Sequence, residues 1–253
     1  MTRLGIWGRG AAGIAALLIF LEVLGRIGLV SRESLPPASD ILKRAAGLAV
    51  ESEFLGHLAG TLTTWGASTA LAACVGIPLG LLLGSVPGVN TATRTVVEFL
   101  RPMPGVALFP LVGMMLGSGS ATRITVVTYV SLWPVLFNTV YGLRDVDPVA
   151  VDTLRSFGFG RLAILRLASL PAAAPFIATG VRLSAGIALI ATVAGEIFMG
   201  TGEGMGVYVA RVSLLPGTTI DVLAVTVWAG LLGLLLNTLL VRGEGRLFFW
   251  VRP

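Results

Sequence analysis

Residues 144–171 read RDVDPVAVDTLRSFGFGRLAILRLASLP, a polar segment that separates two apolar ones. Pro148 is a favourable first residue of a helix and Asp147 a suitable N-cap, so a short helix is expected to begin there. Gly158 and Gly160 are expected to end it, because glycine disrupts helices and permits sharp turns. The segment therefore predicts one to two turns of exposed helix held between two apolar spans.

The composition of the whole chain indicates the environment of this helix. The 253 residues are 55% hydrophobic and only 12% charged, with a mean hydropathy of +0.90. Soluble domains carry about 25% charged residues, so an ordinary soluble enzyme is excluded. The apolar residues fall into several separate runs, and a helix needs about 20 residues to cross a bilayer. We therefore expect an all-α polytopic membrane protein, with one transmembrane domain over residues 1–253.

Six transmembrane helices are predicted, at about 11–30, 62–84, 94–117, 124–143, 175–198 and 222–241. The first is interpreted as a retained span rather than a signal peptide because it is long and contains Glu22 and Arg26. These two charges are four residues apart on one helical face, so they are expected to pair.

Two of the spans contain residues that shape a helix. Gly76, Gly80 and Gly84 recur every four residues in the second span, and a stripe of small residues lets a neighbouring helix approach closely. In the third span, Pro102 and Pro104 are expected to break or kink the helix.

The arginines and lysines predict the orientation, because cytoplasmic loops of membrane proteins are enriched in them. With both termini cytoplasmic, the inner segments hold 11 of the 18 basic residues and the outer segments hold 5. This bias explains the net charge of +5 without nucleic-acid binding. It also makes residues 144–171 the largest cytoplasmic connection.

The short helix of this connection is open to two interpretations. Val151, Leu154 and Phe157 would lie on its surface, where they could fit a groove on another protein. Alternatively, the helix could lie on lipid headgroups, which Arg161 and Arg166 would favour. The residue pattern alone does not separate the two.

The connection resembles the cytoplasmic motif of binding-protein-dependent ABC importer permeases. That motif is a Glu-Ala-Ala triplet, three residues, a glycine, nine residues, an aliphatic residue, one residue, and Leu-Pro. Here these positions hold Asp152-Thr153-Leu154, Gly158, Ala168 and Leu170-Pro171. The glycine and the Leu-Pro pair match, whereas the triplet and Ala168 depart from the pattern.

The resemblance extends over nearly the whole chain and is strongest to permeases of the nitrate, sulfonate and taurine group. The stretches that carry it are Leu35-Pro36, GIPLGLLLG at 76–84, Leu100-Arg101-Pro102-Met103-Pro104, Phe137-Asn138-Thr139, Asp145-Val146-Asp147-Pro148, Leu170-Pro171 with Pro175, Thr179-Gly180-Val181-Arg182, Ala194-Gly195-Glu196 and Gly204-Met205-Gly206.

This resemblance implies a type I importer permease in the bacterial plasma membrane that moves a small solute by alternating access. It further implies a second permease copy or close homologue, two ABC ATPase subunits at the cytoplasmic loops, and an extracytoplasmic solute-binding protein. ATP and Mg²⁺ would be bound by the ATPase partner. The sequence agrees, because its only lysine is Lys43 and no phosphate-binding GxxxxGK[ST] loop is present. We expect this chain to hold no cofactor and to be no enzyme.

Two sets of residues are candidates for function. The surface that couples to the ATPase is expected to comprise Asp152, Thr153, Leu154, Arg155, Gly158, Leu170 and Pro171. The translocation pathway is expected to use polar residues inside spans, because exposing them to lipid costs about 2.5–3.5 kcal/mol. These are Glu98, Arg101, Asn138, Arg182 and Glu196. Other roles stay open, since Glu98 and Arg101 could pair with each other and Arg182 could reach lipid phosphates or a partner subunit.

Two rival functions are weighed against this one. A self-sufficient secondary transporter or channel would use acidic or histidine relays within the membrane, and few are present. An intramembrane serine protease at Gly117–Ser120 would need a histidine base on a later span, and the chain's one histidine, His57, lies upstream. His57 is expected to be solvated or to cap a helix, Cys74 to pack, and no metal site is expected.

Overall fold

The computed structural model describes residues 3–27, 31 and 33–248, and every regular element in this part of the chain is helical. The helices are α1 (Arg3–Ile27), α2 (Ala38–Leu48), α3 (Ser52–Ser85), α4 (Pro87–Leu100), α5 (Gly105–Leu116), α6 (Ser120–Arg144), α7 (Pro148–Ser156), α8 (Arg161–Ile164), a π-helical segment (Leu165–Ser169), α9 (Leu170–Met199), α10 (Met205–Val212) and α11 (Thr219–Leu247).

Four of these helices are long and apolar enough to cross a membrane: α3, α6, the continuous helix Arg161–Met199, and α11. The pair α4 and α5 makes a fifth span if counted together, bent by 94° at the predicted proline break. These spans confirm the all-α polytopic fold. The remaining predicted span, 11–30, coincides with α1 from residue 11 to Ile27, and residues 28–30 lie outside the described part of the chain.

The segment before the second span differs from its prediction. The stretch between the first two predicted spans contains α2, and α3 begins at Ser52, about ten residues before the predicted start at residue 62. Phe54, His57 and Thr61 are buried along one face of this added length. Because neighbouring helices cover this face, its polar residues do not end the helix.

The predicted small-residue stripe is confirmed as a close contact between α3 and α6. A Cβ atom at Gly80 would lie 2.6 Å from Cβ of Thr139, and one at Gly76 would lie 3.0 Å from Cβ of Val135. Gly180 of α9 approaches α6 in the same way, because a Cβ atom there would lie 3.0 Å from the carbonyl oxygen of Pro134. Glycine therefore allows three spans to pack backbone against backbone.

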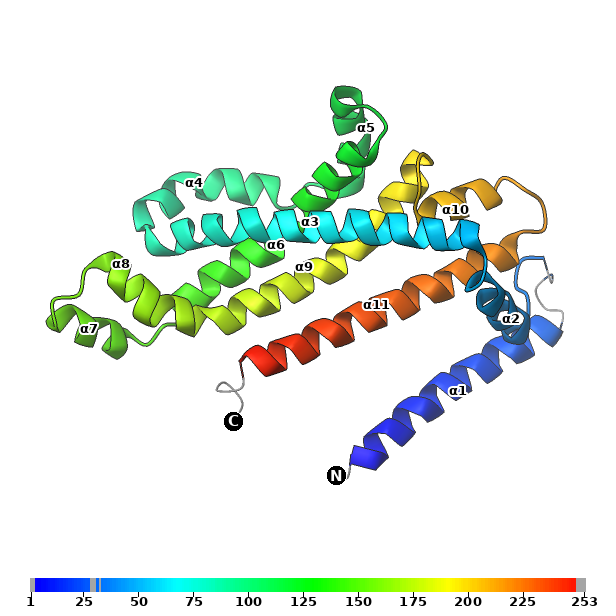
Figure 1. Cartoon of the computed structure of the whole chain (residues 1–253), viewed down its shortest axis with the longest axis horizontal. Helices are drawn as coiled ribbons and strands as arrows, with labels where there is room; N and C mark the ends of the chain where they lie inside the picture. Colours follow the sequence, from blue (N-terminus) through cyan, green and yellow to red (C-terminus); the bar gives the residue numbers. More distant parts are fainter. Residues whose placement is uncertain (1–2, 28–30, 32, 249–253) are drawn as a thin grey trace.

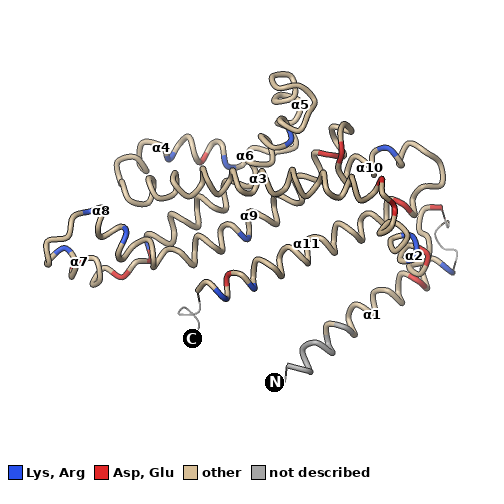
Figure 2. The backbone as a smooth tube through the Cα atoms, in the orientation of Figure 1, with Lys and Arg blue, Asp and Glu red and all other residues tan. Residues whose placement is uncertain are grey.

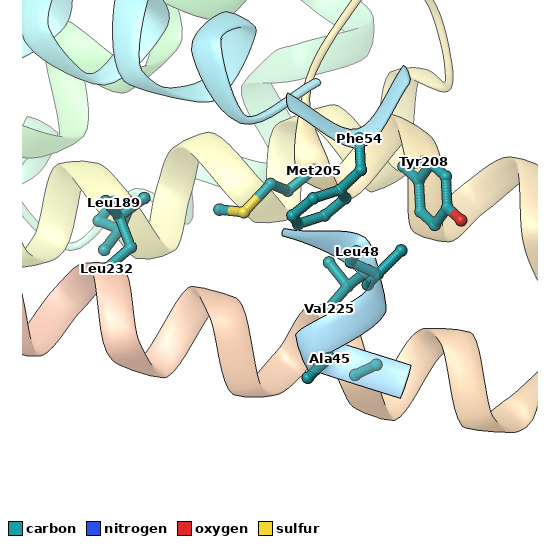
Figure 3. Packing of buried hydrophobic residues seen from close by; sticks show 9 residues of the cluster. Ala45, Leu48, Phe54, Leu189, Met205, Tyr208, Val225 and Leu232 are labelled. Atoms are coloured by element: carbon teal, nitrogen blue, oxygen red, sulfur yellow. The ribbon is translucent and has the colours of Figure 1, made fainter. Parts of the chain in front are cut away.

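A second core lies where α2, α3, α9, α10 and α11 meet (Figure 3). Phe54, Leu48, Met205 and Val225 are almost fully buried there. Arg44 of α2 adds ion pairs to this end of the molecule, with Glu51 before α3 and, at 2.5 Å, with Asp221 of α11. The hydrogen bond to Glu51 is the main cause that raises the pKa of Arg44 above its ordinary value.

The two ends of the bundle are different (Figure 1). Helices α7 and α8 lie at one end, and α2 and α10 lie at the opposite end. The first turn of α1 and the last turn of α11 point toward the end that holds α7 and α8. This arrangement agrees with the predicted topology, in which both termini share a side with residues 144–171. Figure 2 shows arginines at α7, α8 and the end of α11, and a concentration of acidic residues near α2 and α10.

The contact between α3 and α6 leads to a stability prediction. Gly80→Leu would insert a side chain into the space that Thr139 fills, and overpacking of this kind costs about 1–3 kcal/mol. We expect a lower midpoint of thermal unfolding in detergent. Gly66→Leu is the matched control on the same helix, because a Cβ atom there meets nothing within 4 Å. Equal midpoints for the two variants would contradict the packing described.

Candidate functional site

Helix α7 begins as its sequence predicts. Pro148 is its first residue, and the Asp147 carboxylate accepts a hydrogen bond from the backbone N–H of Val149 at 2.8 Å. Asp152 and Arg155 form an ion pair of 2.7 Å on the helix surface. Both side chains are 67% exposed, so this pair adds little stability.

The end of α7 is a Schellman motif. Gly158 takes a left-handed conformation with φ of +81°, its N–H donates to the carbonyl oxygen of Arg155, and the N–H of Phe159 donates to that of Leu154. These two bonds satisfy carbonyl groups that a helix end otherwise leaves free. The predicted stop at Gly158 is confirmed, and only glycine adopts this conformation readily.

The connection from α7 to the next span is more continuous than predicted. The fifth span was predicted to begin at about residue 175, but one helix of 39 residues runs from Arg161 to Met199. Its segment Leu165–Ser169 is π-helical and directly precedes Pro171. A wider turn accommodates a residue that lacks an N–H, so the helix passes through Leu170 and Pro171 without ending.

The exposed surface of α7 also differs in part from its prediction. Phe157 is 78% exposed as expected, whereas Val151 and Leu154 are half-buried because α7 packs against α8 and the π-helical segment. Val149 is 69% exposed. The two exposed apolar side chains lie at opposite ends of α7, beside the exposed polar residues Asp152, Thr153 and Arg155.

Three of the five pathway candidates lie on one face of the bundle. Glu98 and Arg101 line a cavity of about 380 Å³ between α4 and α6, and Arg101 and Asn138 line a neighbouring cavity of about 420 Å³ between α6 and α9. The open possibility that Glu98 pairs with Arg101 is wrong, because Glu98 binds Arg94 at 2.8 Å. Arg101 instead lies over the ring of Phe137, 4.5 Å from its centroid.

The structure separates Arg182 from this face. Its guanidinium forms an ion pair of 3.2 Å with Glu244 of α11, and Glu244 also accepts a hydrogen bond from the hydroxyl of Thr179. These groups lie at a groove between α9 and α11 that is otherwise apolar. The contacts of Arg182 therefore join two spans.

Glu196 is fully buried at the opposite end from α7. Its Oε2 accepts hydrogen bonds from the hydroxyl of Thr61 and the N–H of Gly206. The hydroxyl of Thr61 accepts from the N–H of Met205, and Nδ1 of His57 accepts from the N–H of Gly204. Side chains of α3 and α9 thus satisfy the free N–H groups at the start of α10.

The structure corrects the expectations for His57 and Cys74, which both lie on α3. His57 caps a helix as one alternative had it, but it is only 4% exposed, so its solvated placement is wrong. Cys74 was expected to pack and is exposed instead, because its side of α3 faces away from α6.

Sequence reasoning missed the aromatic residues of α6. Tyr129, Trp133, Phe137 and Tyr141 line the same cavity as Arg101 and Asn138. Their spacing of four residues places them on one helical face, so this periodicity could have revealed them. Arg123, which is buried and donates to the carbonyl oxygen of Glu203, had no sequence signal of this kind.

Comparison with known proteins identifies the arrangement. The sequence pattern of the binding-protein-dependent transport system inner membrane components matches residues 76–248. The chain belongs to this family. The match runs from the glycine stripe of α3 to the end of α11 and includes α7, the cavities around Arg101, Glu196 and α10, whereas His57 and Thr61 precede it.

Several members of this family are similar over most of their length. The taurine transport permease of Escherichia coli strain K12 is 29% identical over 198 residues, which cover 76% of this chain and 72% of the relative. The nitrate import permease of Leptolyngbya laminosa is 27% identical over 236 residues, which cover 93% and 81%.

Solved structures show the same fold. A bacterial alginate ABC transporter, determined in complex with an alginate pentasaccharide-bound periplasmic protein, aligns with a TM-score of 0.65 at 17% identity. The alignment covers 97% of this chain and 98% of that one. The chain is a multi-pass inner-membrane permease of the ABC importer type.

The cap of α10 gives a second prediction. Glu196→Leu removes the acceptor for Thr61 and Gly206, and an unpaired buried polar group costs about 1–3 kcal/mol. We expect faster hydrogen exchange of the backbone amides over residues 200–212, measured by mass spectrometry. Glu203→Leu is the control, because that side chain is exposed. Exchange that is equally slow in both variants would refute the cap.

Proposed function

We propose that this permease is driven by a separate ATPase subunit that binds α7, and that the cytoplasmic connection passes the movement of that subunit to the spans. The observation that carries the proposal is the contact between α7 and a long helix. Helix α7 is capped at both ends, exposed, and packed against the start of a 39-residue helix that crosses the bundle. A displacement of α7 would move this long helix as a unit.

Each residue of the coupling surface has a defined part in this proposal. Asp152, Thr153 and Arg155 present polar groups toward the partner, and Leu154 packs the helix against its support. Gly158 allows the turn that returns the chain to α8. Leu170 and Pro171 lie inside the continuous helix, where the π-helical segment precedes them, and transmit the displacement to α9.

The other subunits of the proposed transporter are inferred from the family. A second permease copy or close homologue would complete the pathway, two ATPase subunits would bind ATP and Mg²⁺, and an extracytoplasmic solute-binding protein would dock at the end that holds α2 and α10. The relatives named above are a taurine and a nitrate permease, so a small solute that carries an oxyanion group, such as a sulfonate or nitrate, is the proposed solute. Glu98, Arg101 and Asn138 face the pathway, whereas Arg182 and Glu196 hold helices together.

The turn after α7 gives the test of this proposal. Gly158→Val forces a branched side chain into the left-handed conformation, which distorts the turn and should lower the yield of ATPase subunit that co-purifies with the tagged permease from its native membrane. Gly160→Val is the matched control, because Gly160 has an ordinary φ of −73° and open space around it. Loss of the ATPase subunit from the Gly160 variant alone, or from neither variant, would contradict the proposal.

A further inference from the structure

Arg101 occupies an unusual position in the bundle. It follows the last residue of α4, at the 94° break before α5, and this break lies about halfway along α3 (Figure 1). The residues that face it, Trp133, Phe137 and Asn138, lie in the middle part of α6. The cation is therefore held between the two ends of the spans, where an ionised side chain is costly unless it has a partner.

Within the described residues, Arg101 has no such partner. No carboxylate lies within 4.0 Å of its guanidinium, and no hydrogen bond joins it to another residue. The acid three residues before it, Glu98, is bound by Arg94. The other cation near the middle of a span, Arg182, is bound by Glu244. Arg101 thus keeps its charge and its N–H donors available.

Aromatic rings hold the guanidinium in place. It lies 4.5 Å from the centroid of Phe137, whose ring stacks between those of Trp133 and Tyr141 at 6.3 and 6.2 Å. A cation over an aromatic face is attracted to it but keeps the N–H groups at its edge free. These rings fix the position of the charge without neutralising it.

The helix break is fixed as well. The hydroxyl of Tyr129 donates to the carbonyl oxygen of Leu100 at 2.6 Å, and this bond ties α6 to the residue directly before Arg101. Arg101 is an exposed residue, and the fixed backbone together with the ring of Phe137 reduces the side-chain ordering that a ligand would have to impose.

The cavity beside Arg101 has a suitable size and composition. Its volume of about 420 Å³ falls within the range of small-ligand sites, and its walls are the aromatic residues of α6 and the aliphatic Leu183 and Ile187 of α9. The indole nitrogen of Trp133 is buried, so this residue contributes its ring rather than a donor. The walls therefore offer one free cation and apolar surface.

We propose that Arg101 and the aromatic face of α6 bind a small monovalent organic oxyanion, a sulfonate or carboxylate on a short apolar chain, partway along the translocation pathway. The planar guanidinium matches the paired oxygens of such a group, and the rings and aliphatic side chains match its hydrocarbon part. A single negative charge matches this cavity, because Arg101 is the one cation among its lining residues. The adjoining cavity is lined by Arg94, Glu98 and Arg144 as well as Arg101. The inference rests on the proposed function and adds a solute-binding site within the permease itself.

The test uses the full-length permease in lipid nanodiscs and isothermal titration calorimetry. Butane-1-sulfonate is the probe, and the neutral butane-1-sulfonamide tests whether charge is required. We expect Arg101→Gln to bind the sulfonate at least about tenfold more weakly than the wild type, because hydrogen bonds to a charged group are lost. Arg242→Gln should bind as the wild type does, since Arg242 is an exposed residue of α11 that lines neither cavity.

Three results would overturn this site: no binding by the wild type, equal binding by Arg101→Gln, or equal binding of the sulfonamide. If Arg101→Gln elutes as an aggregate, Phe137→Leu replaces it, because it removes the ring under the guanidinium and keeps the charge. Weaker sulfonate binding by Phe137→Leu would support the site, and unchanged binding would overturn it. ATPase co-purification measured on the same wild-type preparation reports separately on the proposed function.

Discussion

The close packing of α3, α6 and α9 is the constraint on which the rest of this structure depends. In lipid, apolar side chains gain nothing from contact with each other rather than with acyl chains, so spans associate through tight packing and polar contacts. Glycines at the helix contacts, Gly76, Gly80 and Gly180, bring the backbones together. Larger residues there would separate the spans and widen the spaces in which the polar side chains are held.

This packing explains why polar residues inside the bundle serve different purposes. At the end that holds α2, the buried side chains of Glu196, Thr61 and His57 accept hydrogen bonds from backbone N–H groups at the start of α10. These bonds fix α10 to α3 and α9. On the face formed by α4, α6 and α9, the helix break leaves Arg101 beside open cavities. Polar residues thus stabilise the fold where backbone groups need partners, and they border open cavities where no such groups lie nearby.

The sequence predicted much of this arrangement because local rules govern it. Asp147, Pro148 and Gly158 determine where α7 begins and ends, and the prolines after Arg101 determine the break between α4 and α5. The rest depends on which helices meet. His57 and Thr61 precede the second predicted span, and their burial depends on the approach of α10. Likewise, both Arg94 and Arg101 lie at helical spacing from Glu98. Because the helix bends after Leu100, Glu98 forms its ion pair with Arg94.

The central claim is that α7 binds a separate ATPase subunit, and crosslinking in native membranes tests it most directly. A photoreactive amino acid would replace Val149, which is 69% exposed on α7, or Leu214, which is 85% exposed near α10 at the opposite end. After illumination, mass spectrometry would identify the crosslinked proteins. The account predicts an ATPase subunit crosslinked at position 149 and absent at position 214. Crosslinks from position 149 to lipid alone, or an ATPase subunit captured equally from both positions, would contradict it.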